Sequence, residues 1–183
     1  SSEGAQLVGR TESAGSSYAG LAIPYFLPGE TRVREYRLRR DQPDLECRKD
    51  GSTRERGKYL SPPGRGSLIY FPLRLTPEQV ADKDVPLIFT EGEFKAIALD
   101  RIARQNSEDL RFVAISVPGV WNWRGTVGKT AGPNGERRGL KGPIPDLDLI
   151  EWKRRRVLIA FDADGATNSS VENAEQALMR HLQ

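Results

Sequence analysis

Residues 157–165, VLIAFDADG, place two acids directly after an apolar run. Residues 87–95, LIFTEGEFK, have the same construction, with acids after the run LIFT. Each apolar run is a strand candidate, and acids directly after it are expected at the edge of the sheet. Ligands bind open parallel sheets where the carboxyl ends of the strands meet. The two stretches therefore predict a parallel sheet with acidic side chains along one edge.

Predicted strands and helices alternate through the second half of the chain. Thr76-Pro77-Glu78-Gln79 is a helix start, with a Thr cap, Pro at the first helical position and Gln three residues after the cap. We expect strands at 86–90, 112–117 and 156–161, helices at 91–104, 146–152 and 170–182, and a long connection at 118–144. This alternation predicts an α/β fold, a parallel sheet flanked by helices.

Two of these helices carry apolar residues at helical spacing. In the helix over 91–104, Phe94, Ala98 and Ile102 share one face, with Ile97 beside them. In the last helix, the apolar positions are Val171, Ala174, Leu178 and Leu182. We expect both faces to pack on the sheet.

The first half predicts a smaller, sheet-rich and basic unit. Strands at 21–27 and 33–39 flank a Pro28-Gly29 turn, which indicates a hairpin, and a third strand is expected at 67–73. Residues 31–74 hold twelve Lys and Arg against six acids, which marks either a polyanion-binding surface or a solvated strand face. We expect a flexible leader at 1–19, this basic subdomain at 20–75 and the α/β domain at 76–183.

Composition excludes several classes of protein. The 183 residues include one Cys and one His, too few for a disulfide framework, a Cys/His zinc cluster or a Ser-His-Asp triad. Apolar runs all fall well short of the ~20 residues that a membrane-spanning helix needs. The chain starts with Ser and ends in a helical pattern, so we expect a fragment of a longer protein, truncated at its C-terminus.

The acids of the two opening stretches are candidates for a metal site. Asp162 and Asp164 supply hard oxygen ligands close together, as Mg²⁺ or Mn²⁺ requires, and Glu91 ends a second strand. Gly92 and Gly165 allow sharp turns out of the strands. The alternative is that Asp162 and Asp164 only cap a helix or occupy a turn. Convergence of acids from two strand ends favours the metal site.

Three motifs in order give this half a family resemblance. They are IFTEGEFKAIAL at 88–99, VAISVPGV at 113–120 and VLIAFDADGATNSSVENAEQAL at 157–178. Together they resemble the Toprim domain, which is shared by DnaG-type primases, topoisomerases, a class of nucleases and recombination proteins. The resemblance covers about residues 86–183.

The first half resembles the basic subdomain that precedes Toprim in DnaG-type primases. Its matching segments are GLAIPY at 20–25, RVREYRLR at 32–39 and KYLSPP at 58–63. By that pattern Arg39 and Lys58 match basic positions that line the template and nucleotide groove. The Trp-containing loop VPGVWNWRG at 117–125 is similar to Toprim replication proteins of phages, plasmids and integrated elements.

The resemblance implies a cytoplasmic primase-type nucleotidyltransferase for DNA replication of a mobile genetic element in bacteria, encoded by the host, a phage or a plasmid. Its partners would be a single-stranded DNA template, nucleoside triphosphates and a fused or separate helicase, without a membrane. Mg²⁺ or Mn²⁺ would bind Asp162 and Asp164, with Glu91 as a third ligand or as a general acid/base. Arg39, Lys58, Lys95 and Arg124 would contact nucleotide or nucleic acid. The alternatives are a metal-dependent Toprim nuclease and a non-catalytic DNA-binding module.

One position departs from the primase pattern. Primases usually carry Asp four residues after the motif Glu, and this chain has Lys95 there. Two unit charges at ~4 Å repel by about 4 kcal/mol at an effective dielectric near 20. We therefore expect either that Lys95 points away from Asp162 and Asp164 or that a single metal binds.

Other features have two interpretations each. Trp121 and Trp123 would stack on bases or fix their loop on the core. The run Lys153–Arg156 is either a solvated helix end or a nucleic-acid contact. GTVGKT at 125–130 is no P-loop, because only two residues separate its glycines and a second Gly/Pro turn follows in place of a helix.

Overall fold

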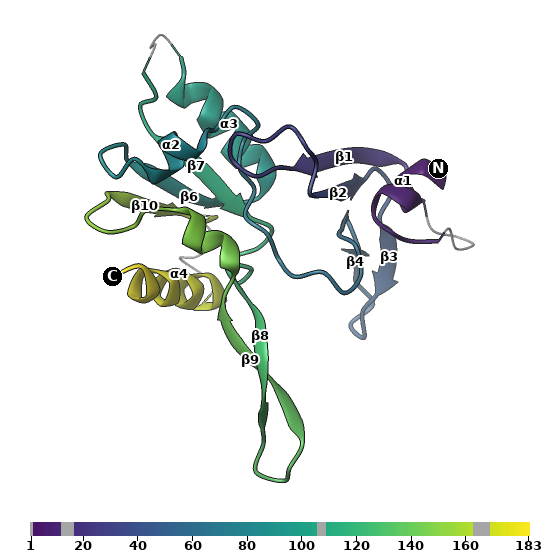
Figure 1. The fold of residues 1–183 in the computed structure, drawn as a ribbon. Coiled ribbons are helices and arrows are strands. Elements are labelled where there is room, and N and C mark those ends of the chain that lie inside the picture. Colours follow the sequence, from purple (N-terminus) through teal and green to yellow (C-terminus); the bar gives the residue numbers. More distant parts are fainter. Residues whose placement is uncertain (1, 12–16, 106–108, 163–168) are drawn as a thin grey trace. The chain divides into compact units, whose positions relative to one another are not determined.

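The computed structural model describes residues 2–11, 17–105, 109–162 and 169–183, which form mixed α/β structure (Figure 1). The chain divides into two compact units, and the boundary lies between Arg65 and Gly66. This division comes earlier than the expected boundary at residue 75, because Ile69, Phe71 and Leu75 are buried in the core of the second unit. None of the helices in the described part of the chain is long and apolar enough to cross a membrane.

The first unit is built on a three-stranded antiparallel sheet with the strand order β1-β2-β5. The predicted hairpin is present, since β1 pairs with β2 from Gly20 opposite Arg40 to Tyr25 opposite Glu35. A second hairpin, β3–β4, lies in the polar stretch for which the sequence predicted no strand. The elements are α1 (Ser2–Leu7), β1 (Gly20–Tyr25), β2 (Glu35–Arg40), β3 (Asp44–Cys47), β4 (Thr53–Arg56) and β5 (Tyr59–Leu60).

Part of the expected leader is packed structure. Ala5 and Val8, in and just after α1, are buried with Tyr18 and Leu38 in a small core of the first unit. Residues 2–8 thereby cover one face of the β1–β2 hairpin. Their Ser/Gly/Ala-rich composition is typical of a linker, so the sequence did not predict this packing. Residues 12–16 of the expected leader lie outside the described residues.

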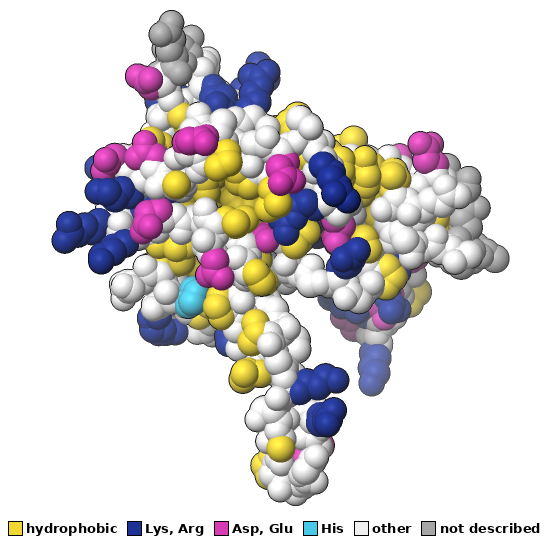
Figure 2. Space-filling view, viewed as in Figure 1, with side chains coloured by type: hydrophobic (Ala, Val, Ile, Leu, Met, Phe, Trp, Pro, Cys, Tyr) yellow, Lys and Arg dark blue, Asp and Glu magenta, His cyan; other side chains and the backbone are white. Residues whose placement is uncertain are grey.

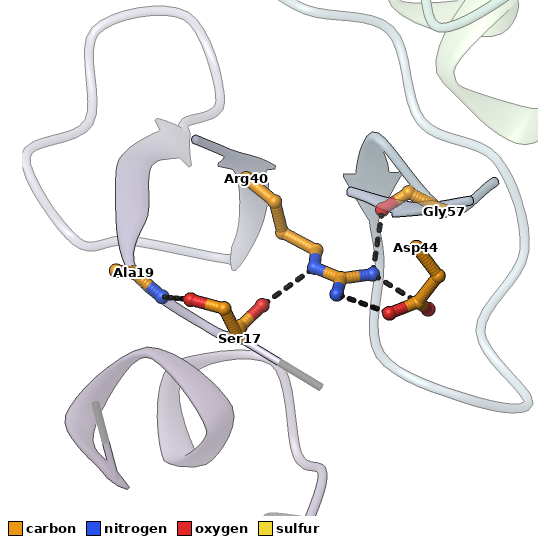
Figure 3. A network of polar contacts seen from close by, with 5 residues as sticks. All are labelled: Ser17, Ala19, Arg40, Asp44 and Gly57. Atoms are coloured by element: carbon orange, nitrogen blue, oxygen red, sulfur yellow. Dashed lines mark hydrogen bonds and ion pairs between the residues drawn. The ribbon is translucent and has the colours of Figure 1, made fainter. Parts of the chain in front are cut away.

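Arg40, at the end of β2, joins three segments of the first unit (Figure 3). Arg40 is 3% exposed, and its guanidinium donates two hydrogen bonds to the Asp44 carboxylate, at 2.7 and 2.9 Å. It also donates to the carbonyl oxygens of Ser17, at 2.6 Å, and Gly57, at 3.3 Å. A bidentate charged pair that also satisfies backbone acceptors has defined geometry, so we assign Arg40 a structural role.

The second unit contains the predicted parallel sheet, with the strand order β10-β6-β7. Leu87 of β6 lies opposite both Val157 of β10 and Val113 of β7. Every residue of β7 is buried. The elements are α2 (Pro77–Ala81), β6 (Leu87–Glu91), α3 (Glu93–Ala103), β7 (Val113–Val117), β8 (Arg124–Ala131), β9 (Arg137–Pro143), the 3₁₀ helix η1 (Pro145–Leu149), β10 (Val157–Ala160) and α4 (Ser169–Leu182).

Local signals located α2 and α4 correctly. The Thr76 hydroxyl accepts from the Gln79 N–H and the Gln79 side chain accepts from the Thr76 N–H, which forms the predicted capping box. In α4, Val171, Ala174 and Leu178 are buried as expected, and Leu182 packs at the edge of the core.

The predicted buried face of α3 is wrong. Phe94, Ile97 and Ile102 are each more than 40% exposed, whereas Glu93, Ala96 and Ala103 are buried. The helix packs chiefly along β7, and the small Ala side chains permit a close approach to that strand. Apolar periodicity ranks Phe and Ile above Ala, so it selected the opposite face.

The predicted strand at 67–73 is also wrong. Only Tyr70 pairs with the sheet, in an isolated antiparallel bridge to Ser116 of β7. Two backbone bonds hold it, from Tyr70 N–H to the Ser116 oxygen at 2.8 Å and from Ser116 N–H to the Tyr70 oxygen at 3.2 Å. Pro72 has no N–H to continue a ladder.

The expected connection at 118–144 contains a β-hairpin, in which β8 pairs with β9. Nearly all of its side chains are exposed, so it lacks the alternation of buried and exposed residues that indicates a strand. The sequence feature that could have predicted this hairpin is the turn Gly132-Pro133-Asn134-Gly135 between two polar segments.

The basic run Lys153–Arg156 contains one structural residue. Arg155 is 7% exposed, and its guanidinium donates to the carbonyl oxygens of Gln79 and Val80 near the end of α2, and of Val85 before β6. Burial lowers the pKa of Arg155. These acceptors would otherwise lack a partner, so we interpret Arg155 as a cap for α2.

We expect Arg155→Ala to lower the free energy of unfolding by about 2–4 kcal/mol, because it leaves one buried and several part-buried carbonyl oxygens without their donor. Urea unfolding followed by circular dichroism measures this change. Arg156→Ala is the matched control, since it removes the same charge from an exposed neighbour and should change stability by less than about 0.5 kcal/mol. Equal losses in the two variants would contradict the capping role.

Candidate active site

The carboxyl edge of the parallel sheet contains the point where the strand order reverses. The chain passes from β6 through α3 to β7 on one side and returns at β10 on the other side of β6. In open α/β sheets the crevice at such a reversal is the usual ligand site. Glu91 ends β6, and Asp162 follows β10 by two residues. Because Thr90 lies opposite Ala160, both acids leave the sheet at this edge.

Backbone geometry at the end of β6 requires glycine. Gly92 has a φ of 81°, which a residue with a side chain adopts only at a cost. Its N–H donates to the Val117 carbonyl oxygen at 2.9 Å, so the turn is joined to the end of β7. The chain turns there from β6 directly into α3, which begins at Glu93. Gly92 thus places the half-buried Glu91 at the sheet edge and the first turn of α3 beside it.

The Lys95 ammonium forms an ion pair with the Asp162 carboxylate. Of the two alternatives expected for Lys95, this contact excludes the one in which it points away from Asp162, and binding of a single metal stays a prediction. A cation in the first turn of a helix lies at the unfavourable, positive end of the helix dipole, and the carboxylate offsets this placement. The Lys95 side chain is 43% exposed and the Asp162 side chain 54%, so solvent and a ligand can reach the pair.

The third predicted acid, Asp164, lies outside the described residues. Within the described ranges no three His, Cys, Asp or Glu side chains form a group that could hold a metal ion. The described part of the site consequently consists of Glu91 and Asp162, with Lys95 between α3 and the strand end.

A buried polar group that the sequence did not predict lies at the start of α3. Glu93 is 1% exposed at the first position of the helix, where the dipole favours a negative charge. Burial raises the pKa of Tyr70 to about 12, and the negative charges of Glu93 and Asp100 contribute. Ser116 is fully buried, and its hydroxyl has no hydrogen-bond partner among the described atoms. The Glu91-Gly92-Glu93 motif thus supplies one acid to the edge and one to the interior.

The two tryptophans of the loop after β7 have different surroundings. Trp123 is 3% exposed, and its ring stacks on His181 of α4 with centroids 5.4 Å apart, so it fixes the loop on the core. Trp121 is 37% exposed, and its indole N–H donates to the Ser170 hydroxyl at the start of α4, at 3.2 Å. Since the loop leaves the carboxyl end of β7, Trp121 offers an aromatic surface on the acidic side of the sheet.

The predicted nucleic-acid residues lie in two places. In the first unit, Arg39 of β2 lies opposite Tyr59 of β5, and Lys58 precedes Tyr59 and pairs with Glu55 at 2.8 Å. Arg37 lies two residues before Arg39, with its guanidinium 4.5 Å from the centre of the Tyr59 ring. In the second unit, the guanidinium of Arg124 lies 5.4 Å from the centre of the Trp123 ring, at the base of the β8–β9 hairpin.

Together, fold and site define an α/β protein with a charged pair at the strand-order reversal of a parallel sheet. The chain belongs to the family described as a domain of unknown function (DUF3854), whose model matches residues 78–183, more than half of the chain. Comparison with curated proteins finds no match, and comparison with solved structures finds none either.

The raised pKa of Tyr70 predicts a loss of stability at alkaline pH. The unfolded chain releases the phenol proton near pH 10, whereas the folded chain keeps it to about pH 12. Folding stability should therefore fall as the pH rises from about 10 to about 12, because the unfolded state then binds fewer protons.

Absorbance titration of the phenols tests this prediction. The parent should show a late phase near pH 12 that Tyr70→Phe lacks and that Tyr36→Phe, a control in the first unit, retains. The same late phase in Tyr70→Phe would show that the environment of Tyr70 has been misassigned.

Proposed function

We propose that the chain is the catalytic core of a primase-type nucleotidyltransferase of the Toprim class, which makes primers on single-stranded DNA for a mobile element. The observation that carries this proposal is the Lys95–Asp162 ion pair at the strand-order reversal, where Glu91 ends the neighbouring strand β6. Two carboxylates and an ammonium within reach of solvent suit a triphosphate substrate with a divalent cation.

The donor set fits Mg²⁺ or Mn²⁺. Both cations prefer carboxylate oxygens, which Glu91 and Asp162 supply from neighbouring strand ends, and Asp164 would be a third ligand. When bound, such a cation offsets phosphate charge and lowers the pKa of an attacking hydroxyl. Glu91 would serve as a ligand or as the general acid/base that moves the proton of the primer 3′-hydroxyl.

We propose that Lys95 binds two different partners. Its ammonium pairs with Asp162 when no substrate is present, and it would turn to a phosphate oxygen when a triphosphate binds. Transfer then joins the hydroxyl oxygen to the α-phosphorus and releases pyrophosphate. The Lys95 ammonium supplies part of the positive charge that a second metal ion would bring to the phosphates. We therefore propose that a single metal ion binds.

The first unit would hold the template strand. The Arg37 guanidinium lies over the Tyr59 ring, Arg39 lies opposite Tyr59 and Lys58 precedes it, so cations and an aromatic side chain occur together there. Single-strand binding surfaces commonly combine these two features. Trp121 would provide a further stacking surface near the acids.

The Lys95–Asp162 pair also favours a second candidate, a single-metal Toprim nuclease. A site with one metal and one lysine can cleave a phosphodiester with water as the nucleophile. Assays for primer extension and strand cleavage under the same conditions separate the two reactions. Nucleic-acid binding with neither activity would identify a non-catalytic module.

Primer synthesis on single-stranded DNA with Mn²⁺ should fall at least a hundredfold in Asp162→Asn, because the variant loses a charged metal ligand. The same variant should lose the rise in melting temperature that Mn²⁺ gives the parent. Asp148→Asn, which changes an exposed acid on η1, should keep both properties. Full metal-dependent synthesis by Asp162→Asn would overturn the site assignment.

Lys95→Asp should raise the stoichiometry of Mn²⁺ binding in calorimetry from one to two. In the parent, the Lys95 ammonium repels a second metal ion by about 4 kcal/mol per pair of unit charges at ~4 Å and an effective dielectric near 20. In the variant, a carboxylate at position 95 attracts that ion instead. Arg101→Asp makes the same charge change at an exposed position of α3 and should leave the stoichiometry at one. Two metals in the parent would contradict the single-metal proposal.

A further inference from the structure

The β8–β9 hairpin forms a two-stranded ribbon of its own. Figure 1 shows its strands running out from the loop before β8, and every strand residue except Gly128 and those near the base is exposed. Residues 124–143 contain five basic residues and one acid. A two-stranded ribbon with both faces exposed gains little from burial, so its length and charge need an explanation other than packing.

The register places four of the five cations on one face. Side chains alternate between the faces of a strand, and directly opposed residues share a face. On β9, Arg137 and Lys141 therefore lie on the same face. Lys129 lies beside Gly139, and Arg124 beside Pro143, which puts both on that face as well.

A β-bulge at Val127 makes this arrangement possible. Arg124 and Lys129 are five residues apart, so regular alternation would put them on opposite faces. The register shift between Thr126 and Gly128 inserts one extra residue and restores the parity. The Lys141 ammonium donates to the Thr126 hydroxyl at 2.9 Å, which places Thr126 on this face too.

The opposite face has a different character. It carries Val127 and Leu140, each more than half exposed, and Arg138, which pairs with Glu136 at 2.5 Å. A Cβ added to Gly142 would come within 2.8 Å of the Val127 side chain, which puts Val127 on the face of Gly142 and Leu140. In Figure 2 the visible Lys and Arg side chains of the ribbon gather along one side and apolar side chains along the other. The ribbon is thus basic on one face and largely uncharged on the other.

The base of the ribbon is held by the core of the second unit. Ile144 N–H donates to the Trp123 carbonyl oxygen at 3.0 Å, which closes the hairpin below Arg124 and Pro143. Trp123 and Ile144 are both buried, and Trp123 stacks on His181. The basic face therefore starts from a fixed point on the α/β core.

We propose that the basic face of the ribbon binds the phosphate backbone of duplex DNA without reading its sequence. Two strands about 5 Å apart fit the major groove, which is about 12 Å wide. Residues 124–143 contain no aromatic side chain for stacking on unpaired bases, which favours a duplex over a single strand. This inference goes beyond the proposed function, because it requires neither a metal nor catalysis.

Adjacent arginines supply a matched experiment. Arg137→Gln and Arg138→Gln remove the same charge one residue apart, from opposite faces. Fluorescence anisotropy of a labelled 20-base-pair DNA duplex in EDTA measures binding over a range of salt concentrations. Arg137→Gln should weaken duplex binding about three- to tenfold, whereas Arg138→Gln should change it less than twofold.

A triple variant, Lys129→Gln with Arg137→Gln and Lys141→Gln, should flatten the plot of log affinity against log salt by about 2–3 units, since each phosphate contact contributes about 0.9. Circular dichroism melting verifies that the parallel sheet unit is intact. Equal effects of Arg137→Gln and Arg138→Gln, or an unchanged slope in the triple variant, would overturn the proposal. The proposal would also be overturned if the triple variant lost binding to single-stranded DNA but kept its binding to the duplex. Because EDTA removes divalent metal, none of these results depends on primer synthesis.

Discussion

Parallel pairing of β6 with both β10 and β7 is the constraint on which the second unit depends. It aligns Leu87 with Val157 and Val113, and so brings the carboxyl ends of β6 and β10 to one edge. Leu87 and Phe89 of β6 are buried, and Val157, Ile159 and Phe161 pack against the same core, so Glu91 and Asp162 follow packed residues at the ends of the two strands. Backbone hydrogen bonding and burial therefore position the candidate site, and no bond between the two acids is needed.

Positive charge has two separate uses in this chain. Arg40 and Arg155 are buried and donate to backbone carbonyl oxygens, so their charge stabilises loops and a helix end. Lys129, Arg137 and Lys141 are exposed on one face of the β8–β9 ribbon, a hairpin that contributes little burial. A buried guanidinium is costly unless its donors are satisfied, whereas an exposed one remains available to a polyanion. Counts of Lys and Arg along the sequence do not separate these cases.

The Lys95–Asp162 pair relates the family resemblance to the chemistry that we propose. A Toprim primase pattern calls for an acid where this chain has Lys95, and that lysine contacts Asp162. Its ammonium offsets a charge that a second cation would otherwise offset. The pair is exposed enough that its net stabilisation in water is small, so a phosphate or a metal can compete for either partner. This balance is why we propose a one-metal site with lysine in a phosphate-binding role.

The sequence by itself determined the elements whose signals are local or strongly apolar. It located the Thr76 capping box, the three strands of the parallel sheet, the buried face of α4 and the position of Glu91 and Asp162 at strand ends. The tertiary structure decided which face of α3 is buried, the edge bridge of Tyr70, the role of Arg155 and the one-sided charge of the ribbon. Each of these depends on a partner distant in sequence or on a register shift of one residue. Composition and periodicity carry no information about either, because both describe only neighbours along the chain.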